Sequence, residues 1–279
     1  MKKYFKLFML MLLVFSYSYS GVMPETDWKI KNLKGKVKSM VKTEYEYDSS
    51  GKLEKTRLTE TYFNEQGYIT DEVQYVDNRL NQSIIYKNNS DGLPIKKDEV
   101  SRRYSYKYEE TKDGNLLVTI KEEYVDKKNF PSLEKITYNK NGKKVHHLVY
   151  SGEELITNDT YIYNKKGNLI EIKDNTFPEN SIKITYNYKA NGDYEKTTDV
   201  ATAKWTYLYD KNGNEKEYIS MIKQGSQGKP KISIYLKFKD ITRDEYGNLT
   251  RNTSVRYDYS KKKESSIYKK LENKYEYYK

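Results

Sequence analysis

A short phrase returns along the chain and restricts its fold more than any other feature. The segment "YIYNKKGNLI" (161–170) comes back as "YLYDKNG" (207–213) and as "YEYDSSGKL" (45–53). In each copy an Asp or Asn side chain can accept a hydrogen bond from the backbone two residues on. The glycine can then take the left-handed conformation that turns the chain back, so each copy predicts an antiparallel hairpin. The predicted turn residues are Asp48 and Gly51, Asn64 and Gly67, Asn139 and Gly142, Asn164 and Gly167, Asp210 and Gly213, and Asp244 and Gly247.

The spacing of the turns predicts how many strands lie between them. Another copy lies at 89–92, and looser copies end at Gly114 and Gly192. Most spacings leave room for two strands and a second, less regular turn. The short interval from Gly51 to Gly67 holds only one strand, so the glycine turns need not all lie at one end of the sheet. At ordinary strand lengths we expect on the order of 16–20 strands.

The segments between the turns alternate between apolar and polar residues, as strands with one covered face do. In 36–48 one face is expected to carry Val37, Val41, Tyr45 and Tyr47, and the other face lysines and glutamates. Tyrosines at a spacing of two put both rings on one face, where they can form ladders across neighbouring strands. The same alternation occurs at 116–124, 182–188, 203–209 and 232–238.

These patterns predict an all-β fold with a long antiparallel meander, which forms either a twisted open sheet or a partly closed barrel. Residues 1–20 have a lysine-rich start, an apolar run and small residues before Gly21, the layout of a secretory signal peptide. We expect 21–35 to be an N-terminal lead-in and 36–279 a single β-repeat domain. The protein is then exported to the periplasm, the cell surface or the medium, and an uncleaved signal anchor is the alternative.

Composition removes several kinds of chemistry. The chain has no cysteine and only two histidines, His146 and His147, so thiolate chemistry and a multi-histidine metal site are excluded within one chain. The two histidines are adjacent on a predicted strand and should face apart. The pairs Glu122–Glu123 and Glu153–Glu154 are expected to be surface residues. We find no catalytic, cofactor-binding or metal-binding constellation, and expect no enzyme and no cofactor.

The repeated phrase resembles the YD-repeat proteins, which include Rhs elements, the shells of insecticidal toxin complexes and teneurins. The matching words are "YEYDSSGKL" (45–53), "YIYNKKGNLI" (161–170), "YLYDKNGNE" (207–215) and "DEYGNLT" (244–250), within about 36–260. The resemblance implies a hairpin array and no catalytic residues. Lysine replaces the family's arginine-rich consensus, and the array is too short to enclose a cargo, so we do not carry over the cocoon function of the large shells.

Three roles for such a protein remain open. The first is a non-enzymatic interaction module with a protein or glycan partner, for which the aromatic surface around Trp205 and Tyr207 is the candidate site. The second is an outer-membrane β-barrel. The third is a polyanion-binding protein, suggested by a net charge of +11, although the lysines are spread along the chain and we expect no nucleic-acid partner. A binding module predicts a contiguous patch of accessible tyrosines, and a polyanion binder predicts one lysine-rich face.

Overall fold

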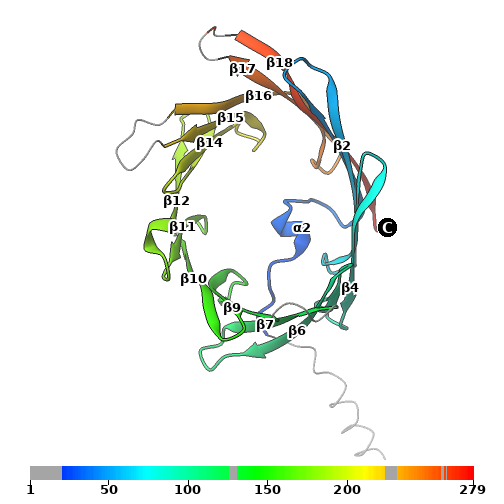
Figure 1. Cartoon of the computed structure of the whole chain (residues 1–279), viewed down its shortest axis with the longest axis vertical. Coiled ribbons are helices and arrows are strands. Elements are labelled where there is room, and N and C mark those ends of the chain that lie inside the picture. The colour runs from blue at the N-terminus through cyan, green and yellow to red at the C-terminus, as the bar shows by residue number, and fades with distance from the viewer. Residues whose placement is uncertain (1–20, 126–130, 224–230, 259–260, 262) are drawn as a thin grey trace, which may run out of the picture.

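The chain forms one closed β-barrel. The computed structural model describes residues 21–125, 131–223, 231–258, 261 and 263–279, and the predicted signal peptide lies outside these residues. Eighteen strands form a single antiparallel sheet, which closes because β1 (Val37–Tyr47) pairs with β2 (Leu53–Phe63) on one side and β18 (Lys263–Tyr277) on the other. Figure 1 shows the resulting ring. The predicted all-β antiparallel fold is therefore confirmed, and the sheet is closed.

The remaining strands follow one another around the ring in chain order. They are β3 (Ile69–Val76), β4 (Arg79–Asn88), β5 (Pro94–Asp98), β6 (Arg102–Glu110), β7 (Leu116–Tyr124), β8 (Ser132–Tyr138), β9 (Lys144–Ser151), β10 (Glu154–Tyr163), β11 (Leu169–Asp174), β12 (Ile182–Tyr188), β13 (Tyr194–Asp199), β14 (Ala203–Tyr209), β15 (Glu215–Ile222), β16 (Lys231–Arg243) and β17 (Leu249–Asp258), with the short helices α2 (Asp27–Ile30) and η1 (Pro178–Asn180).

The turns divide between two rims because consecutive strands run in opposite directions. The start of β1 and the end of β18 lie at one rim, which we call the glycine rim. The 48–51 turn lies at the opposite rim, which we call the loop rim, because β2 alone separates it from the next glycine turn, as the short spacing predicted. The turns of the glycine rim are 64–67, 89–92, 111–114, 139–142, 164–167, 189–192, 210–213 and 244–247.

The turn at 164–167 shows how each copy of the phrase works. The Asn164 side chain accepts hydrogen bonds from the backbone N–H of Lys166 and of Asn168, each at 3.0 Å. The N–H of Gly167 donates to the Asn164 carbonyl at 2.8 Å, and Gly167 has φ +79°. A residue with a Cβ atom is strained at such a φ, which accounts for the glycine.

One face of every strand points into the ring. Helix α2 lies inside the ring in Figure 1, and Trp28 packs against Val37, Met40 and Phe63, which marks the inner face of β1 and β2. Residues paired across neighbouring strands share a face, so the strand registers identify the inner residues of the other strands. On β6 the inner residues are Tyr104, Tyr106 and Tyr108. On β14 they are Trp205, Tyr207 and Tyr209.

The face prediction was wrong for the first strand. The register between β1 and β18 shifts between Val37 and Ser39, and this irregularity reverses the alternation. Val37 therefore faces inward, whereas Tyr45 and Tyr47 lie on the outer face. The expected polar residues of this strand, among them Glu44, face the interior instead.

The N-terminal lead-in packs against the inside of the barrel, where no structured element was predicted. The Asp27 carboxylate accepts a hydrogen bond from the Ile69 N–H at 2.8 Å, and the Trp28 indole donates to the Val37 carbonyl at 2.9 Å. Val22 packs on a second cluster of buried residues, on β7 and β8. None of the helices among the described residues has the length and apolar character needed to cross a bilayer.

Candidate functional site

Six tyrosines form a continuous row on the inner wall, which we call the tyrosine ladder. Tyr194 and Tyr209 are paired across β13 and β14, and their ring centroids are 4.7 Å apart. Tyr207 and Tyr218, across β14 and β15, also lie 4.7 Å apart. Neighbouring contacts of 5.7–6.5 Å complete the row. Its members are Tyr186, Tyr188, Tyr194, Tyr207, Tyr209 and Tyr218.

The ladder offers hydroxyl groups to the interior. Tyr194 and Tyr209 stack closely at an interplanar angle of 11°, and the two ring pairs within single strands lie at 15° and 25°. Among the described residues, no hydrogen bond engages the hydroxyls of Tyr194, Tyr207 or Tyr209, whereas Tyr108 donates to the Pro94 carbonyl at 2.8 Å. Burial raises the pKa of Tyr194 and of Tyr207, so both phenols stay protonated and can donate at neutral pH.

The residues predicted as a binding site, Trp205 and Tyr207, lie within this wall. Both are half-buried on the inner face of β14, and Tyr207 contacts two other rings of the ladder. Sequence reasoning missed Tyr194 because it stands directly after a turn and outside any Tyr-x-Tyr pair. Its register opposite both Tyr188 and Tyr209 joins the aromatic residues of β12 to those of β14.

The inner wall changes character around Glu44 on β1, where charged groups of β1, β2 and β18 gather. The buried Glu44 carboxylate lies 2.8 Å from Lys269 and 3.1 Å from Lys42, and Arg57 is 3.4 Å away. Burial acts to raise the pKa of Glu44, but the hydrogen bonds and charges of Lys269 and Lys42 outweigh it and hold the pKa below its ordinary value. The interior is thus aromatic on one side and ionic on another.

The prediction that Glu122 is a surface residue was wrong. Glu122 is buried on the inner face of β7, where it accepts hydrogen bonds from Arg102 and Tyr104, each at 3.3 Å, and from Ser132. The sequence could not show this, because these partners come from other strands. Its neighbour Glu123 lies on the outer face, as expected for adjacent residues of a strand.

The two histidines face apart, as their adjacency predicted. His147 points inward and lies 2.5 Å from the Glu134 carboxylate, and His146 lies 2.9 Å from the Asn158 side chain. The hydrogen bond with His147 lowers the pKa of Glu134. Within the residues that the structure describes, no three His, Asp or Glu side chains are grouped so that they could hold a metal ion.

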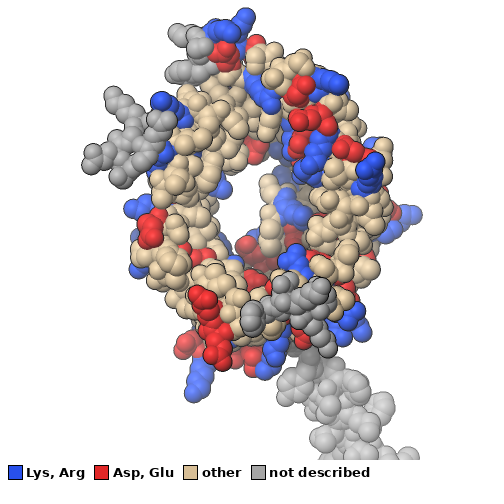
Figure 2. Space-filling model, in the orientation of Figure 1, with Lys and Arg blue, Asp and Glu red and all other residues tan. Residues whose placement is uncertain are grey.

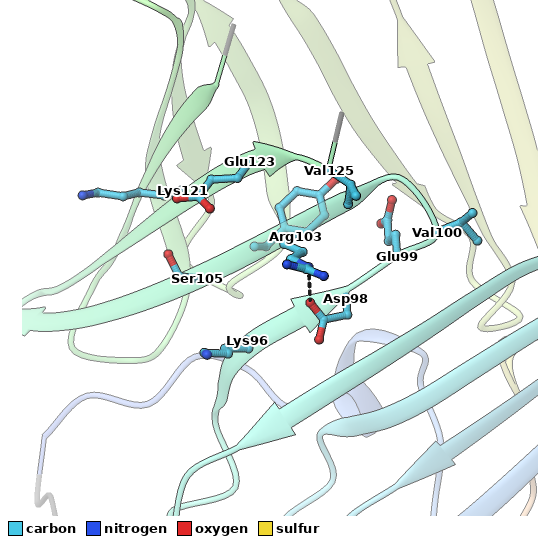
Figure 3. Close-up of a pocket in the computed structure, with 10 residues that line it drawn as sticks. Lys96, Asp98, Glu99, Val100, Arg103, Ser105, Lys121, Glu123 and Val125 are labelled. Carbon is cyan, nitrogen blue, oxygen red and sulfur yellow. Dashed lines mark ion pairs between the residues drawn. The ribbon is translucent and has the colours of Figure 1, made fainter. Parts of the chain in front are cut away.

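A cavity of about 590 Å³ lies at the outer wall over β5, β6 and β7, near the loop rim. Figure 3 shows its lining, with the ion pair between Arg103 and Asp98 at 3.9 Å. Both side chains are more than half exposed, and Lys121 and Glu123 add one further charge of each sign. Exposed charges of balanced sign are ordinary for a hydrated surface, so this cavity is a weaker candidate than the interior.

The outer wall carries charges around the ring. Exposed ion pairs join Lys38 to Glu276 and Lys107 to Glu109, each at 2.9 Å. Figure 2 shows basic and acidic residues interspersed over the visible face, with no lysine-rich side, and a passage open at the centre of the ring. An 18-stranded barrel is wide enough for such an aqueous interior.

Comparison with known proteins supports the fold. No family model matches the chain, and no curated protein matches it. The chain is similar to a porin-like protein from Bacteroides uniformis, with a TM-score of 0.50 and 12% identity over 92% of this chain and 99% of that one. It is also similar to the Tc holotoxin pore of Photorhabdus luminescens, at a TM-score of 0.26 and 11% identity over 80% of this chain and 16% of that one. The first likeness supports the barrel fold, which fits the outer-membrane alternative in architecture.

Proposed function

We propose that this protein is an exported, non-enzymatic binding protein whose ligand lies in the barrel interior along the tyrosine ladder. The observation that carries the proposal is the row of protonated phenols at Tyr194, Tyr207 and Tyr209, whose hydroxyls make no hydrogen bond within the described part of the chain. A phenol can both donate and accept a hydrogen bond. A row of them suits an elongated ligand that is rich in hydroxyl groups and carries no net charge, such as an oligosaccharide.

The charge distribution supports an uncharged ligand over a polyanion. A polyanion binder needs lysines gathered on one face, and basic and acidic residues alternate over the visible surface. Inside the barrel, the cations near Glu44 are matched by Glu44 and Glu46.

The test is isothermal titration calorimetry of the mature protein against a panel of neutral oligosaccharides. The variant Tyr207→Phe/Tyr209→Phe keeps both rings and removes both hydroxyls. Each lost hydrogen bond costs about 1 kcal/mol, so we expect affinity to fall roughly tenfold or more. The matched control is Tyr45→Phe on the outer face, which should bind like the parent protein. Equal affinity of the double variant and the control would refute the ladder as the binding surface.

An outer-membrane barrel is the second candidate, and the barrel architecture favours it. The strand number is even, the first strand begins and the last strand ends at the glycine rim, and the eight turns described there are short, as in transmembrane barrels. Its main cost is the outer wall, where groups such as Lys107 and Glu109 would meet lipid. A lysine at the bilayer midplane costs roughly 2–4 kcal/mol. Strands β5 and β11, of five and six residues, are also shorter than the roughly 9–11 residues that span a bilayer.

Fractionation of cells that express the full chain separates the two candidates. A membrane barrel stays in the membrane pellet after alkaline carbonate extraction and needs detergent for release. The exported binding protein is found in the periplasm or medium without detergent. Recovery only in the detergent fraction would overturn the periplasmic or extracellular location that we propose. The calorimetric test of the ladder would still apply, because the ladder lies in the barrel interior in either case.

We further propose kinship with YD-repeat proteins, on the strength of the repeated words and the turns that they form. The test is to replace one turn by the corresponding turn of a YD-repeat protein. Replacing the 210–213 turn by the consensus of a YD-repeat protein should preserve the barrel, measured by circular dichroism and the midpoint of unfolding. A collapse of the barrel would show that the likeness of the words is superficial.

A further inference from the structure

The barrel wall is almost unpaired at one seam. Strands β11 and β12 share only two register pairs, Glu171 with Lys183 and Ile172 with Ile182. On its other side β12 is paired with β13 along the whole stretch from Lys183 to Tyr188. The edge of β12 that faces β11 is therefore open from Ile184 to Tyr188, a length of about 16 Å at the usual rise per residue.

A cavity of about 660 Å³ lies at this seam. Ile184, Tyr186 and Tyr188 line it from the inner face of β12, and Lys183 and Thr185 line it from the outer face. Because residues of both faces border the cavity, it lies within the wall rather than on one side. The remaining lining comes from β11 and from the turn before it: Asn164, Lys165, Lys166, Ile170 and Glu171.

The lining combines an open backbone edge with a defined side-chain pattern. Apolar and aromatic groups alternate along β12 with Lys183 and Thr185, as an added strand would require of its partner. Lys165 and Lys166 add two cations, and Glu171 is the one acidic group in the lining. A peptide with acidic residues on one face and apolar residues on the other complements this pattern.

Two side-chain contacts now span the open part of the seam. The Asn168 amide donates to the Tyr188 hydroxyl at 3.0 Å, and the Lys166 ammonium lies 4.6 Å from the centre of the Tyr188 ring. Tyr188 is half exposed, so a ligand can reach it and take over both contacts. The hydrogen bond is exposed to solvent, so both contacts can exchange with a ligand.

We propose that this seam binds an extended acidic peptide, which adds as an antiparallel strand to the open edge of β12. Its backbone pairs with residues 184–188, its apolar side chains contact Ile184 and Tyr186, and its carboxylates contact Lys183 and the lysines of the 164–167 turn. Backbone pairing supplies affinity, and the alternating side chains supply specificity. The site shares Tyr186 and Tyr188 with the ladder, but the proposal rests on the open edge of β12 and not on the interior ligand.

The test uses the mature protein and fluorescence anisotropy of a labelled peptide of alternating glutamate and valine. We expect binding, and roughly tenfold weaker binding by Lys183→Glu. The matched control is Lys173→Glu, on the same outer wall but outside the cavity, which should bind like the parent protein. Hydrogen exchange provides a second readout, because peptide pairing should slow the amides between 184 and 188.

Three outcomes overturn the proposal. Equal binding of a peptide interrupted by proline would show that charge alone acts, since proline cannot pair along a strand. Equal weakening by Lys173→Glu would place the peptide elsewhere on the wall. Concentration-dependent dimerisation that Lys183→Glu abolishes, with no peptide binding, would make a second copy of the chain the occupant. The oligosaccharide test changes Tyr207 and Tyr209, which do not line this cavity, so the two proposals fail independently.

Discussion

Gly67 and Gly213 occupy equivalent positions in two turns of the glycine rim but have different surroundings. Their φ angles are +89° and +79°, so alanine at either site incurs a backbone cost of about 1–2 kcal/mol. A Cβ at Gly67 would lie 2.6 Å from the Trp28 ring, whereas a Cβ at Gly213 would meet nothing within 4 Å. We expect Gly67→Ala to destabilise the barrel by about 1–3 kcal/mol more than Gly213→Ala, because the Trp28 ring must shift.

Guanidinium unfolding followed by circular dichroism measures both variants, and a cycle with Trp28→Ala isolates the contact. In the Trp28→Ala background, the difference between the two glycine variants should fall within about 0.5 kcal/mol of zero, since the obstructing ring is gone. Both changes replace glycine by alanine, so effects on the unfolded chain cancel. An equal loss of stability in the parent background would refute the placement of α2 against the 64–67 turn.

Two more predictions concern charged groups of the inner wall. Glu122→Ala should lower the free energy of unfolding by about 1–3 kcal/mol, because it leaves the Tyr104 and Ser132 hydroxyls without their acceptor, while Arg102 keeps its ion pair with Glu99. Glu123→Ala on the outer face should stay within about 0.5 kcal/mol of the parent in the same assay. Acidification should weaken the barrel through Glu134. Its pKa is held below the ordinary 4.5 by His147, so its contribution is full above that value and is lost as the pH falls through the lowered pKa. Urea unfolding at about pH 7 and about pH 3 should show a smaller acid loss for Glu134→Gln, and an unchanged loss would contradict this account.

The turns and strands could be read from the sequence because their causes are local. An Asp or Asn three residues before a glycine determines a turn by contacts within five residues, as at Asn164. Closure has no such local cause. Closure requires the offsets between neighbouring strands to add up around the sheet until β18 pairs with β1. These offsets depend on irregularities such as the one between Ile162 and Tyr163. The sequence therefore predicted a sheet that was open or partly closed.

The sequence also did not show which face of each strand points into the barrel. Val37 and Val41 are four residues apart, which is an even spacing and predicts one face. An irregularity between Val37 and Ser39 places them on opposite faces without leaving any mark in the apolar pattern. Glu122 and Glu123 were likewise indistinguishable by type, and only the cross-strand partners of Glu122 make it an interior residue.

The candidate site arises where copies of the repeat differ. The pairs Tyr161–Tyr163 and Tyr207–Tyr209 stand in the same phrase, yet the Tyr163 hydroxyl donates to the Lys144 carbonyl at 2.8 Å, whereas Tyr209 stacks on Tyr194. The position two residues after the turn glycine explains the ladder's continuity. It is leucine after Gly167 but Tyr194 after Gly192, and a leucine there would separate the rings of β12 from those of β14.

The same stretch of wall therefore carries both candidate sites for one physical reason. Strand β12 contributes Tyr186 and Tyr188 to the ladder through the edge that pairs with β13. Its other edge is unpaired from Ile184 onward, where it faces the start of β11 at Leu169 and the 164–167 turn. A peptide that binds at the open edge would displace the contacts of Tyr188 and so reach the first ring of the ladder from outside the barrel.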